Sequence, residues 1–247
     1  MKIVIITGGS RGIGASAARL CARDGIGVIL TYNSNPACAE AVVAGIEADG
    51  GNAVALKLDV ADTSTFPAFR DAVGAALKTY WGREDFDGLV NNAGYGVFNP
   101  IATVTEAEFD GLFAVHLKGP FFLTQTLLPL IADGGHIVNV ASATTRVATA
   151  GVAPYASFKG GLEVLTRYMA KEFGHRGIRA NSIAPGAIRT DLGGGLDDEF
   201  EVMLAGQTAL GRVGEPDDVG GAIAGLFSDH NRWVNAQSIE IAGGYII

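Results

Sequence analysis

The amino-acid sequence predicts an α/β protein in which a parallel β-sheet carries helices on both faces. Short runs of β-branched and aliphatic residues recur at regular intervals, and Ala-rich segments with apolar residues three or four positions apart lie between them. This alternation is typical of βαβ units, whose right-handed crossovers produce a doubly wound parallel sheet. Glycine accounts for 35 of the 247 residues, about twice its usual share, which indicates tight turns and close backbone approaches.

Each predicted strand is an almost uninterrupted apolar run, so we expect every strand to be buried on both faces. The strands are expected at residues 3–6, 27–32, 53–58, 88–90, 136–140, 179–183 and 238–241. Helices are expected at residues 15–23, 37–48, 66–80, 106–131 and 155–173. After Pro185 the chain becomes glycine-rich, and three acidic residues at 197–199 open a short helix. We interpret residues 186–210 as a substrate loop and, since no linker or repeat interrupts the pattern, residues 1–247 as a single domain.

Composition excludes several classes of protein. There are 18 basic and 26 acidic side chains, a formal charge of −8, and no Lys/Arg-rich run, so a nucleic-acid-binding role is excluded. Two cysteines and four scattered histidines indicate neither a disulfide framework nor a metal site. No apolar run is long enough for a membrane span or a signal peptide, so we expect a cytoplasmic location.

Directly after the first strand, residues 7–14 read Thr-Gly-Gly-Ser-Arg-Gly-Ile-Gly, and a helical segment follows. Glycines there allow a sharp turn that presents backbone N–H groups and a helix N-terminus to an anion, as in a dinucleotide diphosphate site. The spacing differs from G-x-G-x-x-G, and the alternative is a tight strand-to-helix turn without a ligand.

The end of the second strand indicates which nicotinamide dinucleotide would bind. An acidic residue there accepts a hydrogen bond from the 2′-hydroxyl of NAD, but no acidic residue lies between Asp24 and Glu40. The window instead offers Tyr32, Asn33 and Ser34, and Arg11 in the adjacent glycine loop can pair with a 2′-phosphate. We therefore predict NADP(H) over NAD(H); the alternative is that Arg11 is only a solvated loop residue.

Tyr155 and Lys159 are four residues apart in a predicted helix, so they share one face. We expect the ammonium to lower the pKa of the phenol toward neutrality, as proton exchange with a carbonyl requires. The strand at 136–140 delivers Ser142 at its carboxyl end, and parallel strands bring such residues to one crevice.

Taken together, these motifs resemble the short-chain dehydrogenase/reductase family over essentially the full chain. Further matches are Leu58-Asp59-Val60, Asn91-Asn92-Ala93-Gly94, Pro185-Gly186 with Thr190, and the closing Gly243-Gly244. The resemblance implies a single Rossmann-type domain whose seven parallel strands have the order 3-2-1-4-5-6-7. It also implies a homotetramer, with helices near 105–130 and 155–174 packed across a two-fold interface.

The resemblance implies roles for individual residues. Tyr155 is the general acid, Ser142 donates to the substrate oxygen, and Lys159 lowers the phenol pKa and contacts the nicotinamide ribose. The implied cofactor residues, besides Tyr155 and Lys159, are Gly8, Ser10, Arg11, Gly12, Ile13, Gly14, Tyr32, Asn33, Ser34, Asp59, Val60, Asn91, Ala93, Gly94, Pro185, Gly186, Ile188 and Thr190. Asp59, Asn92 and Thr190 have structural alternatives, as a helix cap, a turn former and an N-cap. By position, the substrate would meet Tyr95, Ala143, Thr144, Ala187 and Leu192, a set that favours a moderately hydrophobic ketone.

His116 departs from the family pattern, in which many members carry an Asn that helps a water relay protons to the lysine. Because histidine titrates near neutrality, we predict a catalytic relay with a different pH dependence. The alternative is an inert core histidine.

The leading hypothesis is a reversible NADPH-dependent carbonyl reductase (EC 1.1.1.-) that acts on a small molecule. A second is a 3-oxoacyl thioester reductase, although the acidic net charge and the lack of basic residues before Ser142 disfavour an acidic carrier protein. Only Arg176 and Arg179 could form a small basic patch. A third hypothesis, from another class, is a non-catalytic dinucleotide sensor on the same fold.

Overall fold

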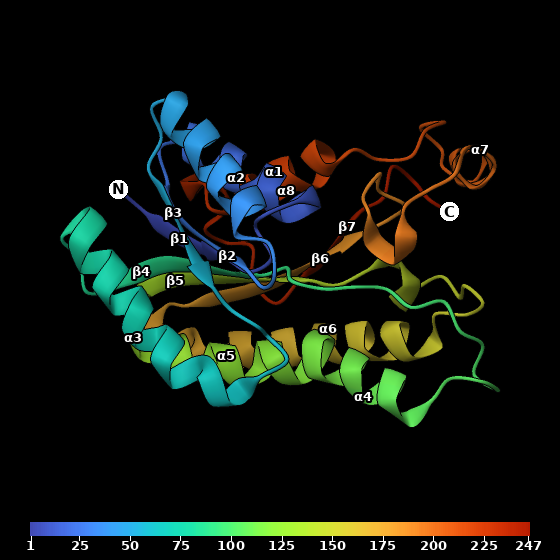
Figure 1. Cartoon of the computed structure of the whole chain (residues 1–247), viewed down its shortest axis with the longest axis horizontal. Helices are drawn as coiled ribbons and strands as arrows, with labels where there is room; N and C mark the ends of the chain where they lie inside the picture. Colours follow the sequence, from blue (N-terminus) through green and yellow to red (C-terminus); the bar gives the residue numbers. More distant parts are fainter.

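The computed structural model describes all residues, 1–247, and contains one seven-stranded sheet (Figure 1). Its order is β3-β2-β1-β4-β5-β6-β7, and every neighbouring pair is parallel. The predicted fold class and strand order are confirmed. The strands are β1 (Ile3–Ile6), β2 (Gly27–Tyr32), β3 (Ala53–Lys57), β4 (Phe86–Asn91), β5 (Ile131–Val140), β6 (Arg179–Pro185) and β7 (Ser238–Ile241).

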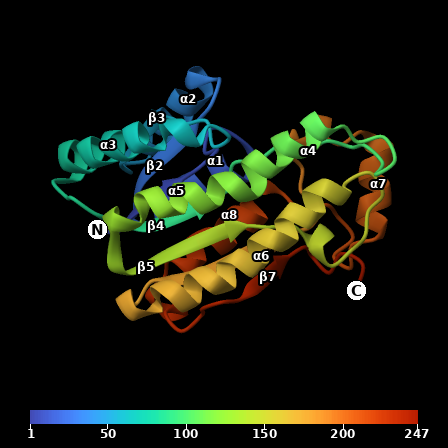
Figure 2. The same ribbon diagram turned by 90° about the horizontal axis from the view of Figure 1, so that it is seen from below.

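Helices cover both faces of the sheet (Figures 1 and 2). One face carries α1 (Gly12–Arg23), α2 (Pro36–Ala48) and α8 (Pro216–Leu226). The other face carries α3 (Phe66–Ala76), α5 (Gly119–Leu127) and α6 (Ala153–Phe173). Two further helices, α4 (Glu106–Phe113) and α7 (Asp198–Gly206), lie toward the carboxyl ends of the strands.

Alternation along the strands divides the core between the two faces. In β1, Val4 and Ile6 belong to the cluster under α1 and α8, whereas Ile3 and Ile5 belong to the cluster under α3 and α5. Successive side chains of a strand point to opposite faces. This explains why the central strands are apolar at every position.

The two edge strands differ from the prediction, which expected all strands to be buried. β3 is only partly buried beyond Ala53, and Ser238 and Glu240 of β7 are exposed. Each of these strands has a single neighbour in the sheet, so part of its surface stays open to solvent.

The helix expected at 106–131 is divided into α4, a π-helical turn at Ala114–Lys118, and α5. Pro120 has no N–H to donate to the His116 carbonyl four residues earlier, so the regular hydrogen-bond ladder is interrupted there. A 3₁₀ turn at Leu128–Leu130, which contains Pro129, then ends the helix. β5 therefore begins at Ile131 rather than at 136, and its pairing with β4 shifts register between Phe86 and Gly88.

No helix of the structure combines the length and the apolar character that crossing a membrane requires.

Candidate active site

A cavity of about 680 Å³ opens where the carboxyl ends of the strands meet. It is lined by residues that follow β1 to β6. Every residue that the sequence analysis assigned to catalysis, cofactor or substrate lines this cavity, with the single exception of Asn91. The chain therefore brings the candidate residues together, as expected for ligand crevices of parallel sheets.

The glycine loop forms one wall of the cavity. Gly8 has a φ of +64°, and a Cβ there would lie 2.9 Å from the Ala93 Cα. A Cβ on Gly14 would lie 2.3 Å from the Gly8 carbonyl oxygen, so only glycine fits. None of the backbone N–H groups of Gly12, Ile13 and Gly14 donates to another residue. These free donors at the N-terminus of α1 fit a diphosphate.

Asn92 and Thr7 join the glycine loop to the turn after β4. The Asn92 side-chain amide donates to the carbonyls of Thr7 and Gly8 at 2.9 and 3.2 Å. The Thr7 hydroxyl accepts from the backbone N–H groups of Asn92 and Ala93 at 2.9 and 3.0 Å. Asn92 therefore fastens the glycine loop to the turn after β4. From the sequence it was expected to form a turn, without this contact to the loop.

Asn91, predicted to line the cofactor wall, lies inside the sheet layer instead. Its amide donates to the Asn139 side-chain oxygen at 2.8 Å and to the Thr124 hydroxyl at 3.3 Å. Because neighbouring side chains of an extended segment point to opposite sides, Asn91 and Asn92 cannot both face the cavity. The assignment of Asn91 to the cofactor wall is therefore corrected.

The far end of the cavity is lined by Tyr32, Asn33 and Ser34, with Asn35 and Cys38 beside them. Asp59 and Val60 follow the neighbouring strand β3 and also line the cavity, and the Asp59 carboxylate accepts from the Ala61 N–H at 2.9 Å. No carboxylate lies at the end of β2. The Arg11 guanidinium is 66% exposed and stands 3.6 Å from the Asp191 carboxylate.

Ser142, Tyr155 and Lys159 meet at the centre of the cavity. Ser142 follows β5 and caps a short 3₁₀ turn, its hydroxyl accepting from the Thr144 N–H at 3.2 Å. Tyr155 lies in the first turn of α6, which begins at Ala153, and Lys159 follows one turn later. Lys159 is 4% exposed, and its Nζ donates to the Val140 carbonyl at 2.5 Å. The Nζ stands 5.6 Å from the centre of the Tyr155 ring.

Burial dominates the electrostatics of this group. It raises the pKa of Tyr155 to about 12, although the neighbouring Ser142 hydroxyl acts in the lowering direction. It also lowers the pKa of Lys159 to about 7. The expectation that the phenol pKa falls toward neutrality is therefore wrong for the protein alone, because burial penalises the charged form and raises this pKa instead. At neutral pH the phenol is protonated.

His116 lies on the π-helical turn and is 1% exposed. Its Nε2 is 2.8 Å from the Tyr95 carbonyl oxygen, and its Nδ1 is buried without a partner. Burial, followed by the charge of Lys159, lowers the pKa of His116 to about 3. The expectation that His116 titrates near neutrality is therefore wrong. The ring is neutral, and since a carbonyl can only accept, Nε2 carries the hydrogen.

The segment after β6 forms the opposite wall, with Pro185, Gly186, Ile188 and Thr190 facing the cavity. The Gly186 N–H donates to the Ile241 carbonyl at 3.1 Å, and a Cβ on Gly186 would lie 2.7 Å from the Ala242 Cβ. Thr190 approaches Gly12 of the glycine loop closely. This wall is therefore held against both β7 and the loop.

The outer part of the cavity is apolar. Tyr95, Ala143, Thr144, Ala187 and Leu192 line the cavity, and their contact with a substrate stays a prediction. Residues that the sequence analysis missed also line it: Phe98, Val152, Leu196, Phe200, Leu204 and Tyr245. Leu196, Phe200 and Leu204 lie within the predicted substrate loop, and Tyr245 directly follows the closing Gly243-Gly244, whereas Phe98 and Val152 had no such signal.

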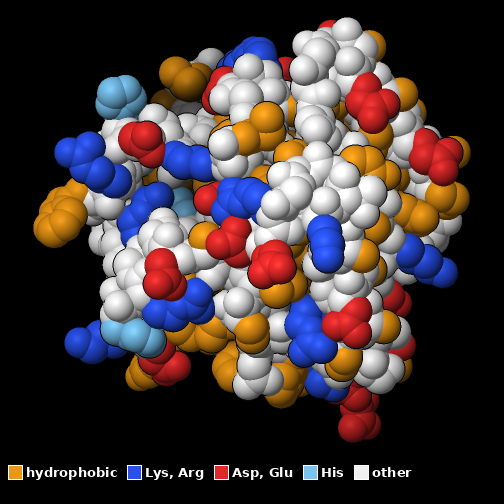
Figure 3. Space-filling view, turned by 90° about the vertical axis from the view of Figure 1, so that its left-hand side faces the viewer, with side chains coloured by type: hydrophobic (Ala, Val, Ile, Leu, Met, Phe, Trp, Pro, Cys, Tyr) orange, Lys and Arg blue, Asp and Glu red, His pale blue; other side chains and the backbone are white.

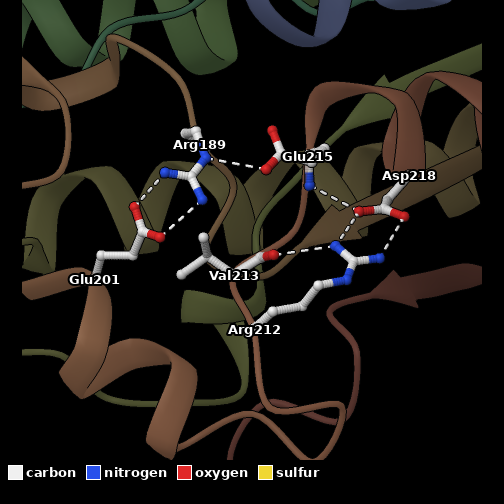
Figure 4. Close-up of polar contacts among 6 residues, drawn as sticks. All are labelled: Arg189, Glu201, Arg212, Val213, Glu215 and Asp218. Atoms are coloured by element: carbon white, nitrogen blue, oxygen red, sulfur yellow. Dashed lines mark hydrogen bonds and ion pairs between the residues drawn. The ribbon is translucent and has the colours of Figure 1, made fainter. Parts of the chain in front are cut away.

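Charged side chains hold the 186–210 segment in place (Figure 4). Arg189 pairs with both carboxylate oxygens of Glu201 on α7, at 2.5 and 2.7 Å, and with Glu215 before α8 at 3.0 Å. Arg212 pairs with Asp218 in the same way, at 2.6 and 2.9 Å. These contacts tie α7 to the start of α8.

Arg176 and Arg179 do not form the small basic patch that the sequence allowed. Arg176 pairs with Asp133, and Arg179 donates to the carbonyls of Asn231 and Val234. Both lie at the amino end of β6, away from the cavity. The face of the molecule in Figure 3 mixes acidic and basic side chains without a patch of one sign.

The chain matches known proteins over almost its whole length. A family model described as Enoyl-(Acyl carrier protein) reductase matches residues 8–246. An uncharacterized oxidoreductase of Methylorubrum extorquens is 39% identical over 246 residues, 98% of this chain and 97% of its own. A 3-oxoacyl-[acyl-carrier-protein] reductase of Staphylococcus aureus is 35% identical, with the same coverage.

Solved structures of similar proteins have the same fold. The angucycline C-6 ketoreductase LanV with bound NADP superposes with a TM-score of 0.94 at 34% identity, covering 99% of this chain and 95% of its own. A second structure of this ketoreductase holds NADP and rabelomycin.

Proposed function

The chain belongs to the short-chain dehydrogenase/reductase family of oxidoreductases, and from that premise we propose that it reduces a small-molecule ketone to a secondary alcohol with NADPH, reversibly. The observation that carries the proposal is the convergence of Ser142, Tyr155 and Lys159 with the glycine loop in one cavity. Each group alone has a structural explanation, but a buried lysine without a carboxylate is costly to fold.

The glycine loop and α1 would hold the diphosphate, with Asp59 and Val60 near the adenine and Ile188 and Thr190 near the nicotinamide. When bound, the cofactor supplies the hydride. The polypeptide's part is to orient it, exclude water and supply a proton.

The site favours a direct proton donation by Tyr155. Its phenol, protonated at neutral pH, transfers the hydroxyl proton to the carbonyl oxygen of the substrate as negative charge develops there. The Ser142 hydroxyl donates to the same oxygen. The Lys159 ammonium stabilises the resulting phenolate, which takes up a proton from solvent to close the cycle.

We propose NADP(H) rather than NAD(H), because hydroxyl and amide groups stand at the end of β2 in place of an acidic residue and Arg11 lies in the adjacent glycine loop. The NADP carried by LanV supports this choice. To receive the 2′-phosphate, Arg11 would exchange its exposed contact with Asp191 for a charge-assisted one. In Arg11→Ala, the ratio of kcat/KM for NADPH over NADH should fall about tenfold; an unchanged ratio would refute this role.

A free ketone is the favoured substrate. The outer cavity is apolar, and Arg189, the basic residue that follows this wall, is already paired with Glu201 and Glu215. Nothing there offers an acidic carrier a free basic patch. The rabelomycin bound by LanV is a free small molecule, whereas the Staphylococcus aureus relative keeps 3-oxoacyl thioester reduction as the second candidate.

We propose that residues 1–247 act as one domain in the cytoplasm and assemble as a homotetramer, with the 186–210 segment as substrate loop. Exposed aromatic side chains along α4, α5 and α6 support the two-fold contact: Phe109, Phe113, Phe121, Phe122 and Tyr168. Large apolar side chains left exposed on neighbouring helices are typical of protein interfaces. Light scattering after gel filtration tests the assembly.

The direct test of the activity follows NADPH oxidation at 340 nm with aryl ketones, β-ketoesters and an acetoacetyl thioester. We expect turnover, with the free ketones preferred. Preference for the thioester would select the second candidate. Tight NADPH binding without turnover on any member of the panel would favour a non-catalytic dinucleotide sensor.

A further inference from the structure

Residues 94–98, here called the wall segment, form one side of the outer cavity. They belong to no helix or strand, and none of their backbone groups bonds to another backbone group. The chain is anchored just before them, by Ala93 to Thr7, and just after them, by the Asn99 N–H to the Gly151 carbonyl at 2.8 Å. Between these anchors there is one hydrogen bond, from the His116 Nε2–H to the Tyr95 carbonyl at 2.8 Å.

The wall segment also touches the 186–210 segment on the other side of the cavity. A Cβ on Gly96 would lie 3.5 Å from the Gly193 Cα, and a Cβ on Gly193 would lie 2.8 Å from the Phe98 ring. A shift of the wall segment therefore changes the width of the space in which a substrate would lie.

His116 is well placed to hold this segment still. Its ring stands edge-on to Tyr155, with centroids 4.9 Å apart, and 5.7 Å from the Tyr95 ring. Gly94 leaves room for it, since a Cβ there would lie 2.8 Å from the His116 Cε1. The ring has no other hydrogen bond, because Nδ1 is buried without a partner. The bond to the Tyr95 carbonyl is thus the only hydrogen bond of the His116 ring.

We infer that His116 is a positioning residue for the substrate: its Nε2–H holds the Tyr95 carbonyl and so fixes the wall segment at the spacing that the ketone requires. This inference rests on the proposed function. It assigns His116 a role in substrate binding that depends on Nε2, the nitrogen farther from the backbone. Loss of the bond frees the wall segment and leaves the Tyr95 carbonyl without its protein partner.

Three variants separate this role from mere filling of space. Glutamine reaches about as far as Nε2 and can donate to Tyr95; asparagine reaches only as far as Nδ1; leucine keeps volume but no donor. His116→Leu and His116→Asn should raise the KM for the ketone about tenfold, the effect of one lost hydrogen bond and its unsatisfied partner. His116→Gln should restore KM to within about threefold of wild type, with kcat differing less than KM between the Gln and Leu variants.

Amide hydrogen exchange supplies a readout that needs no turnover. His116→Leu should speed exchange of the two hydrogen-bonded N–H groups that flank the wall segment, those of Ala93 and Asn99, and leave exchange in the sheet unchanged; His116→Gln should restore their protection. His175→Gln, a change at an exposed histidine beyond the far end of α6, is the matched control and should change nothing.

Equal KM values for the Gln and Leu variants, or unchanged exchange at Ala93 and Asn99 in His116→Leu, would overturn the inference. If His116→Leu fails to fold, the comparison of Gln with Asn decides in the same way. Because exchange is measured without substrate, failure of the proposed reductase activity is distinguishable from failure of the role inferred for His116.

Discussion

The two sides of the cavity handle charge in opposite ways. On the α6 side, Lys159 is buried with no carboxylate partner, and its Nζ contacts only the Val140 carbonyl. On the side of the 186–210 segment, Arg189 and Arg212 are about half exposed and paired with three carboxylates (Figure 4). The α6 side therefore holds one buried charge without a counter-ion, whereas the side of the 186–210 segment holds several charges that are neutralised in ion pairs.

This difference indicates which region performs chemistry and which one moves. Burying an unpaired charge shifts its pKa and destabilises the fold, so such a group is retained for function. Exposed ion pairs contribute little to stability and break easily. We therefore expect large effects from changes at Lys159 and small ones at Arg189.

Lys159→Met should give the largest effect, in opposite directions for activity and stability. Turnover should fall on the order of 100-fold or more, because the phenolate loses its stabilising cation. The variant should also be more stable at pH 7. Burial places the pKa of Lys159 at about 7, below its unfolded value, so the unfolded chain binds more protons between these values and wild-type stability rises with pH there. Thermal unfolding should show a Tm several degrees above wild type; a lower Tm would contradict the account of Lys159.

The pH dependence of reduction sharpens the comparison further. Lys159 is protonated below its pKa of about 7, while Tyr155 stays protonated and His116 stays neutral across this range. The rate of ketone reduction should therefore fall as pH rises through 7, by up to about tenfold per unit. Paired groups of the other region should not contribute, since Arg212 holds the pKa of Asp218 at about 2. A flat profile between pH 5 and 9 would count against the role of Lys159.

Arg189→Ala should have the smallest effect. Releasing Glu201 and Glu215 loosens α7, and we expect the KM for the ketone to rise about two- to threefold with a stability loss below about 1 kcal/mol. High salt should reproduce part of this change in wild type, because it screens exposed pairs. Arg70→Ala, which removes an exposed pair with Asp71 on α3, serves as the control. A large loss of stability in Arg189→Ala would show that the two regions are more alike than we infer.

Local signals explain how much of the fold could be predicted. Uninterrupted apolar runs located the central strands, and the glycine loop was recognisable because close backbone approaches there leave no room for side chains, as at Gly14. The break at His116 depends on Pro120 four residues later, so this proline is a local sequence signal for two helical segments in place of the one expected at 106–131. The edge strands depart from the pattern because burial there depends on neighbours.

Other parts of the site depend on contacts between distant segments. Phe98 and Val152 reach the cavity from two separate stretches of chain, and no local pattern marks them. The pKa values of Tyr155 and His116 follow from burial depth, which spacing does not reveal. Asn91 and Asn92 differ only in the direction of their side chains, so the choice between them required the structure.

The most direct test of the central claim is NADPH oxidation by Tyr155→Phe, measured beside NADPH binding in the same preparation. The account predicts loss of nearly all turnover, at least about 100-fold, because the proton donor is removed. The affinity for NADPH should stay within about threefold of wild type, since the loss of one hydroxyl leaves the glycine cradle intact. Retention of most of the activity would contradict the assignment of Tyr155 as the proton donor and with it the proposed mechanism.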